Sequence, residues 1–191
     1  DNEPEKSVKK KKDNSRALRR KAKSVQLKKV LHLEKPGGAL PKNLDPSAKP
    51  LTVGAWCTPE SGDGVLVAQG GASIGYSLYL AGGKARFAIR SNGVLKEIAS
   101  AEKIETGKRI HIVGTLEANG KLALLVNGSA VAKGDGLLLP GKPSDGLNVG
   151  EDAGSLVADY PASTKFKGSL EDIRIYWGVL DSKALKAWAK K

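Results

Sequence analysis

The chain has 191 residues, a net charge of +12, one cysteine and two histidines. The length suits one domain plus a tail, and a single cysteine excludes an internal disulfide. No apolar run approaches the roughly 20 residues that a membrane-spanning helix needs. Twelve Lys or Arg and only four acidic residues lie in residues 1–29. The basic character therefore belongs mainly to the N-terminal end, and the charge of the whole chain does not by itself indicate a nucleic-acid partner.

Residues 1–50 form the first predicted unit, a basic linker or tail. Within it, residues 15–23 contain good helix formers but almost no apolar face, so we expect a short and marginal helix. Residues 25–33 alternate loosely and are compatible with a first strand, whereas residues 36–50 are interrupted by Pro and Gly and predict a long loop.

Residues 51–191 form the second predicted unit, a β-sandwich. Short runs rich in Val, Ile and Leu are separated by turn signals such as Asn-Gly, which favours the backbone of tight hairpins. This spacing predicts strands at 51–57, 64–69, 76–80, 85–90, 94–99, 109–117, 122–126, 129–132, 147–150 and 168–177.

Alternation along these strands separates a core face from an outward face. Phe87 and Ile89 point to one side of their strand, and Arg86 and Arg90 point to the other.

One further element is predicted at the end of the chain. Asp181 is placed to cap a short helix, on which Leu185 and Trp188 share one face that can pack on the sandwich.

The order of several motifs resembles a known family. A strand carrying Trp56, the turn at residues 69–71, the strand from His111 to Thr115, the turn Asn127-Gly128 and the ending at residues 168–180 succeed one another as in concanavalin A-like, laminin G-type domains. The resemblance implies an all-β fold, a two-sheet antiparallel jelly-roll sandwich with a short C-terminal helix and a basic N-terminal segment. It also implies a domain that binds rather than catalyses.

A narrower resemblance involves residues 146–160 and the strand that begins at residues 166–170. These segments are similar to the C-terminal region of bacterial arylsulfatases, in which a Gly- and Asp-containing loop precedes such a strand. The resemblance implies an accessory module of a secreted or periplasmic sulfatase-type hydrolase, whose catalytic domain would be a partner.

Catalytic residues are not expected in this chain. Residues 57–61 approach the sulfatase nucleophile signature C-x-P-x-R, but Ser61 stands where the signature has Arg. We therefore interpret Cys57 as a small core residue. His111 matches a recurrent position of the resembled family, which favours a structural hydrogen bond. The sequence predicts that the chain is not an enzyme.

Three outward-facing side chains form the predicted ligand site. Tyr79, Arg86 and Arg90 share one face of adjacent strands, where Arg suits the sulfate or carboxylate groups of a polysaccharide. The alternative is an ordinary solvated sheet face.

Three acidic residues form a candidate Ca²⁺ site. Glu151, Asp152 and Asp159 flank a Gly-containing loop, and Ca²⁺ takes oxygen ligands. The alternative is a solvated turn whose carboxylates bond to nearby backbone.

Three functions remain open from the sequence. The favoured hypothesis is noncatalytic recognition of carbohydrate or of another extracellular ligand, with a polysaccharide or sulfated glycan as the expected partner. A second is a packing module that binds no ligand of its own. A third is a polyanion-binding protein that acts through its basic tail, although the absence of aromatic residues there argues against single-stranded nucleic acid.

Overall fold

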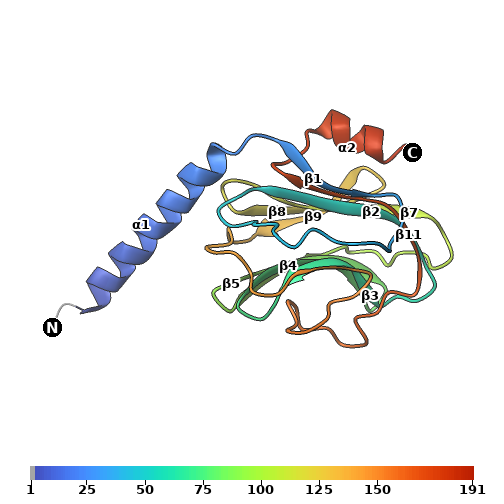
Figure 1. Cartoon of the computed structure of the whole chain (residues 1–191), viewed down its shortest axis with the longest axis horizontal. Helices are drawn as coiled ribbons and strands as arrows, with labels where there is room; N and C mark the ends of the chain where they lie inside the picture. Colours follow the sequence, from blue (N-terminus) through green and yellow to red (C-terminus); the bar gives the residue numbers. More distant parts are fainter. Residues whose placement is uncertain (1–2) are drawn as a thin grey trace.

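The structure, a computed structural model, describes residues 3–191 as a two-layer antiparallel sandwich (Figure 1). The larger sheet has the order β1 (Lys28–Leu33), β11 (Gly168–Trp177), β2 (Leu51–Pro59), β7 (Ile110–Leu116), β8 (Lys121–Val126), β9 (Ser129–Asp135). The smaller sheet has the order β10 (Leu147–Val149), β3 (Gly64–Gly70), β4 (Ile74–Ala81), β5 (Lys84–Ser91), β6 (Val94–Ala99). The predicted all-β sandwich and its strands are confirmed.

The core lies between the two sheets and follows the predicted alternation. Phe87 and Ile89 are fully buried on the inner face of β5, opposite the inner face of β7. Gly114 on β7 provides the space for this contact, because a Cβ there would lie 2.4 Å from the Phe87 ring. Only a residue without a side chain lets the aromatic ring approach the opposite backbone so closely.

A second apolar cluster covers the outer face of the larger sheet. The helix α2 (Ser182–Trp188) lies on this face, and its cap is the predicted one, since Oδ1 of Asp181 accepts a hydrogen bond from the Ala184 backbone N–H at 2.8 Å. Leu185 and Trp188 are buried as predicted. They pack with Trp56, Val113, Tyr176 and Leu180.

A loop segment covers part of the outer face of the smaller sheet. Residues 151–166, drawn in orange below β3 and β4 in Figure 1, run between β10 and β11. Ala158 joins a third buried cluster on this face, and Tyr160 packs against it. The outward-facing side chains of this sheet therefore lie partly under a cover.

The helix α1 (Glu3–Lys23) is longer than the nine-residue segment predicted from the sequence. Its N-terminal end projects away from the sandwich (Figure 1). Its C-terminal half packs on the sandwich through buried Ala22 and partly buried Leu18, and Lys11 and Asn14 line a cleft between the helix and the sandwich loops. The following strand β1 pairs with β11, from Lys28 opposite Trp177 to Leu33 opposite Ile173. Residues 28–33 thus belong to the sandwich rather than to a separate linker. No helix within residues 3–191 combines the length and the apolarity needed to cross a membrane.

Candidate ligand-binding face

Tyr79 lies on the outer face of β4, as the alternation predicts, but its ring is covered. It is 2% exposed and meets Tyr160 edge to face, with the ring centroids 5.0 Å apart. Its hydroxyl donates a hydrogen bond to Oε2 of Glu97 at 2.5 Å. Burial and the Glu97 carboxylate raise the pKa of Tyr79 well above its usual range. A sugar ring therefore cannot stack on Tyr79 unless residues 151–166 move.

The two predicted arginines differ in how many of their hydrogen-bond donors are paired with other groups of the chain. Arg90 donates from Nε to the carbonyl of Val157 at 2.8 Å and from Nη2 to Oδ1 of Asp159 at 3.2 Å, so it fastens the covering segment to β5. Arg86 has one contact, of 3.5 Å, between Nη1 and Oε1 of Glu97, and its buried Nε has no hydrogen-bond partner. Of the two, Arg86 has more unused hydrogen-bonding capacity.

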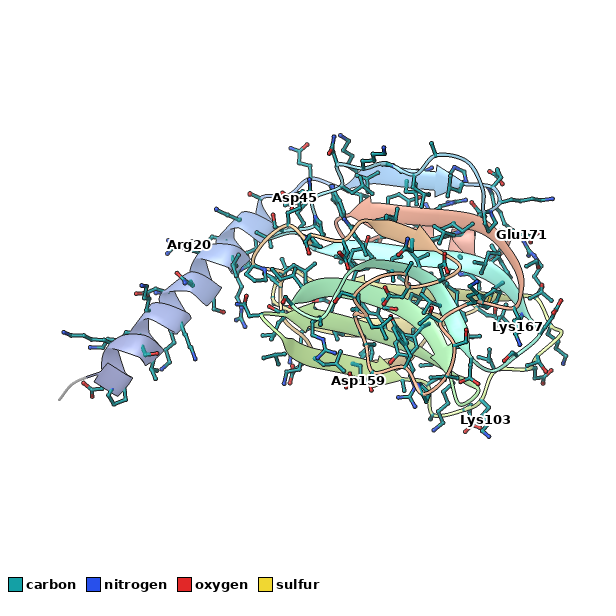
Figure 2. All side chains as sticks on the ribbon, turned by 60° about the horizontal axis from the view of Figure 1, so that its bottom comes forward. Arg20, Asp45, Lys103, Asp159, Lys167 and Glu171 are labelled. Atoms are coloured by element: carbon teal, nitrogen blue, oxygen red, sulfur yellow. The ribbon has the colours of Figure 1, made fainter. Side chains whose placement is uncertain are left out.

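The three acidic residues do not converge on one point. Asp152 is 3% exposed, and its Oδ2 accepts hydrogen bonds from the Val157 backbone at 2.9 Å and the Tyr160 hydroxyl at 2.5 Å. Burial raises the pKa of Asp152, and its Oδ1 has no partner. Asp159 is exposed at the edge of the covering segment beside Arg90 (Figure 2). Glu151 is partly exposed. A Ca²⁺ site at these residues remains a prediction.

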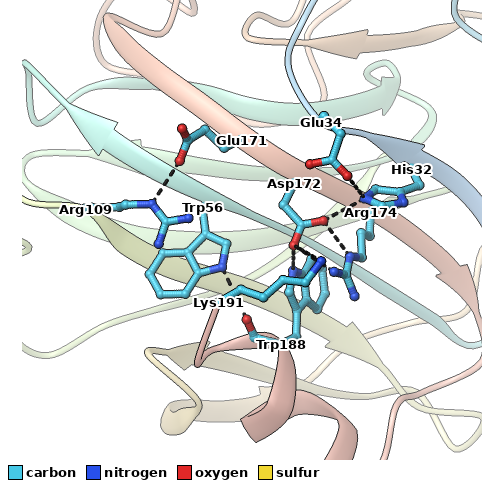
Figure 3. Close-up of polar contacts among 9 residues, drawn as sticks. All are labelled: His32, Glu34, Trp56, Arg109, Glu171, Asp172, Arg174, Trp188 and Lys191. Atoms are coloured by element: carbon cyan, nitrogen blue, oxygen red, sulfur yellow. Dashed lines mark hydrogen bonds and ion pairs between the residues drawn. The ribbon is translucent and has the colours of Figure 1, made fainter.

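A network of charged and aromatic residues lies on the opposite outer face, beside α2 (Figure 3). At its centre is Asp172, which is 5% exposed and has a left-handed φ of 48° where β11 shifts register. Its Oδ1 accepts from Nε2 of His32 at 2.7 Å and Nε of Arg174 at 2.8 Å. Its Oδ2 accepts from Nη2 of Arg174 at 2.7 Å and Nε1 of Trp188 at 3.1 Å. Burial opposes the charge of Asp172, but the hydrogen bonds and charge of Arg174 hold the pKa of this carboxyl below its usual range.

His111 makes a structural hydrogen bond through its backbone, because its N–H donates to Oδ1 of Asn127 at 2.9 Å, whereas its ring makes none. The ring lies between Trp56 and Trp188, with centroid distances of 5.0 and 4.6 Å, and neither ring nitrogen has a hydrogen-bond partner. Burial lowers the pKa of His111 to about 4, so the imidazole is neutral at neutral pH. The aromatic side chains of β2 and α2 enclose the ring, so the His111 side chain contributes packing rather than a hydrogen bond.

Cys57 occupies the predicted core position. It is almost fully buried near the end of β2, and burial raises the pKa of its thiol to about 12. A thiol in this environment stays protonated and is not an effective nucleophile at neutral pH.

An open cleft that the sequence did not indicate lies beside the loop that joins β6 to β7. Its volume is about 500 Å³, and its lining includes the apolar side chains of Ile104, Ile110 and Val131 together with Lys103 and Lys108. No motif marks this loop in the sequence, and its lining has no aromatic residue. Glu102 and Glu105 also line the cleft, and Glu105 pairs with Lys108, so the surface provides apolar contact and charges of both signs but no platform on which a sugar ring could stack.

The fold is that of a two-sheet, jelly-roll-like β-sandwich. The sequence profile of the concanavalin A-like lectin/glucanases superfamily matches residues 35–186, and the chain belongs to this superfamily. No curated protein sequence matches the chain.

Several solved structures share the fold. The CBM40 domain of a Ruminococcus gnavus sialidase, bound to α2,3-sialyllactose, has a TM-score of 0.61 and 15% identity, and the match covers 86% of this chain and 97% of that one. Domain 4 of the Geobacillus stearothermophilus extracellular arabinanase AbnA, in complex with arabinotriose, has a TM-score of 0.61 and 21% identity, with 78% and 70% covered. A pentraxin from Limulus polyphemus has a TM-score of 0.58 and 19% identity, with 82% and 80% covered. At these identities, the similarity demonstrates a shared fold.

Proposed function

We propose that this chain is a noncatalytic module that recognises carbohydrate. The main support for the proposal is the structural match to the CBM40 domain of a sialidase, which covers 86% of this chain and 97% of that domain. The enclosed, neutral His111 and the buried Cys57 support the noncatalytic part, because neither side chain is placed to activate a substrate.

The outer face of β5, at the margin of residues 151–166, is the proposed contact surface. Arg86 contributes a partly exposed guanidinium whose one ion pair, with Glu97, is 3.5 Å long, and Arg90 positions the covering segment next to it. Tyr79 lies beneath this surface and positions Glu97, the ion-pair partner of Arg86, through a hydrogen bond from its hydroxyl. A planar guanidinium binds sulfate and carboxylate groups through paired hydrogen bonds, which favours an acidic glycan as ligand.

The proposal also includes a parent protein and a cellular location for the module. A secreted sulfatase-type hydrolase is the proposed parent, on the basis of the sequence resemblance in residues 146–170. The extracellular arabinanase among the similar structures supports an extracellular location. In such an enzyme, the module would hold the catalytic domain near its polymer and raise the local substrate concentration.

A glycan array of neutral, carboxylated and sulfated polysaccharides tests the proposal, with and without Ca²⁺. We expect the full chain to bind at least one acidic glycan, and Arg86→Gln to weaken this binding tenfold or more. Lys133→Gln is the matched control, because it removes one positive charge from an exposed position on β9 in the other sheet. Equal binding by Arg86→Gln and the unchanged chain would refute the site, and silence across the array would favour the packing module.

A second candidate function, polyanion binding, is supported by the outward face of α1. Five basic residues recur at intervals of three or four along the side opposite Leu18, and all five are exposed: Lys9, Lys12, Arg16, Arg20 and Lys23. Figure 2 shows the N-terminal part of this helix projecting from the sandwich, with Arg20 labelled nearer the end that meets it. Residues at such spacing share one helix face, so a linear polyanion could contact them together.

The salt dependence of heparin binding tests this second function. We expect the unchanged chain to elute from a heparin column at a higher salt concentration than a variant with these five residues replaced by Gln, because fewer counterions are released when charges are lost. Arg86→Gln distinguishes the basic face of α1 from the outer face of β5, because it should not change heparin elution if α1 alone binds the polyanion. If the five-residue variant elutes with the unchanged chain, α1 does not bind polyanions.

A further inference from the structure

Three potential metal ligands meet where β1 runs beside β11. His32 lies on β1, Glu34 follows the end of that strand, and Asp172 lies on β11. Residues two apart in an extended chain point to the same side, which brings His32 and Glu34 together. The Asp172 backbone N–H donates to the Glu34 carbonyl at 3.0 Å, so the main chain holds the third residue beside the first two.

The spacing of the ligand atoms is close to that of a metal site. Nε2 of His32 lies 2.7 Å from Oδ1 of Asp172 and 3.0 Å from Oε1 of Glu34. All three atoms lie within 4.8 Å of one another, and no other such group occurs among residues 3–191. Tetrahedral Zn²⁺ with bonds of about 2.0–2.2 Å separates its ligands by roughly 3.4 Å. Side-chain shifts of less than about 1.5 Å would therefore accommodate such an ion.

The surroundings orient the buried ligand and leave the other two accessible. Asp172 is fixed by both donors of Arg174 and by the indole of Trp188, the kind of outer hydrogen bonds that position metal-binding carboxylates. His32 and Glu34 have side chains that are 31% and 77% exposed, so a hydrated ion can reach them from solvent.

The balance of charge and ligand type favours one class of ion. Arg174 and Lys191, the latter with Nζ 3.8 Å from Oδ2 of Asp172, oppose a cation, whereas the two carboxylates attract it. Imidazole is a good ligand for Zn²⁺, Ni²⁺ and Cu²⁺, while Ca²⁺ takes six to eight oxygens. One imidazole and two carboxylates therefore suit a transition ion better than Ca²⁺.

We infer that His32, Glu34 and Asp172 form a binding site for a divalent transition ion such as Zn²⁺. Nε2 of His32 would bind the metal as a neutral imidazole that carries its proton on Nδ1, and one coordination position remains for water. Bound there, the ion joins the edge strand β1 to β11 beside the end of α2, and so stabilises the edge of the larger sheet.

Isothermal titration with Zn²⁺, together with thermal unfolding, tests the inference on the full chain. We expect one Zn²⁺ per chain, a higher unfolding temperature with Zn²⁺, and binding at least tenfold weaker in His32→Ala and Glu34→Gln. His32→Gln gives a second variant that can still donate a hydrogen bond to Asp172. The control Glu171→Gln removes a neighbouring carboxylate that pairs instead with Arg109 and should bind Zn²⁺ as the unchanged chain does.

Several results would overturn the site. They are the absence of saturable heat, unchanged affinity in both His32 variants, or displacement of Zn²⁺ by equimolar Ca²⁺. Because His111 is the chain's only other histidine, imidazole NMR signals identify which ring meets the ion. A shift of the His111 signal without one of His32 would also contradict the inference.

Discussion

Lowering the pH should destabilise the fold through His111. Burial lowers its folded-state pKa to about 4, whereas an unfolded histidine titrates near pH 6.5. Between these two values the unfolded chain binds more protons than the folded chain, so stability is fully present above about pH 6.5 and falls as the pH falls towards 4. At about 1.4 kcal/mol for each pKa unit, the full difference is roughly 3 kcal/mol.

Urea unfolding at pH 7.5 and pH 4.5 measures this loss. We expect the unfolding free energy of the unchanged chain to fall by roughly 2–3 kcal/mol between these conditions through His111 alone. His111→Phe keeps an aromatic ring between Trp56 and Trp188 but cannot titrate, so its loss should be smaller by about that amount. Asp172, whose folded pKa is lowered, loses its stabilising effect only at more acidic pH. Equal losses in both proteins would refute the assignment to His111.

Two further substitutions test the packing and the charge network. Asp172→Asn keeps a residue type that tolerates the left-handed backbone but removes the charge that pairs with Arg174, and we expect a loss of roughly 3 kcal/mol in urea unfolding; a loss below about 0.5 kcal/mol would mean that the pair is effectively solvated. Gly114→Ala should cost about 1–3 kcal/mol in thermal unfolding because its Cβ would meet the Phe87 ring. Phe87→Leu in the Gly114→Ala background should recover part of the Gly114→Ala loss, and strictly additive losses would contradict this contact.

The strands and the C-terminal helix could be predicted because the signals for them, alternation of apolar residues and a capping residue, lie within a few residues of one another. Alternation placed Phe87 and Ile89 in the core, and the cap at Asp181 located α2. The length of α1 could not be predicted, because a helix with so little apolar surface gives no periodic signal of where it begins.

The site was less predictable because it depends on contacts between distant segments. Alternation placed Tyr79 on the outward face but could not show that Tyr160, 81 residues later, would cover it. The network at Asp172 escaped prediction because the register shift in β11 interrupts the alternation from which faces are assigned. The signal in the sequence was a group of charged residues, Glu171, Asp172 and Arg174, within a strand that is otherwise mostly apolar.

The antiparallel pairing of β1 with β11 also determines how the domain would respond to pulling. The chain leaves α1 and enters β1 at Lys28, which lies opposite Trp177, where β11 ends before α2. A force applied between these two ends would load that residue pair first and then open the ladder one pair at a time. Strands arranged in this way unzip at low force, whereas strands pulled lengthwise must break all their hydrogen bonds together. The cluster around Asp172 lies at the far end of the same ladder, so it would be the last part of this edge to open.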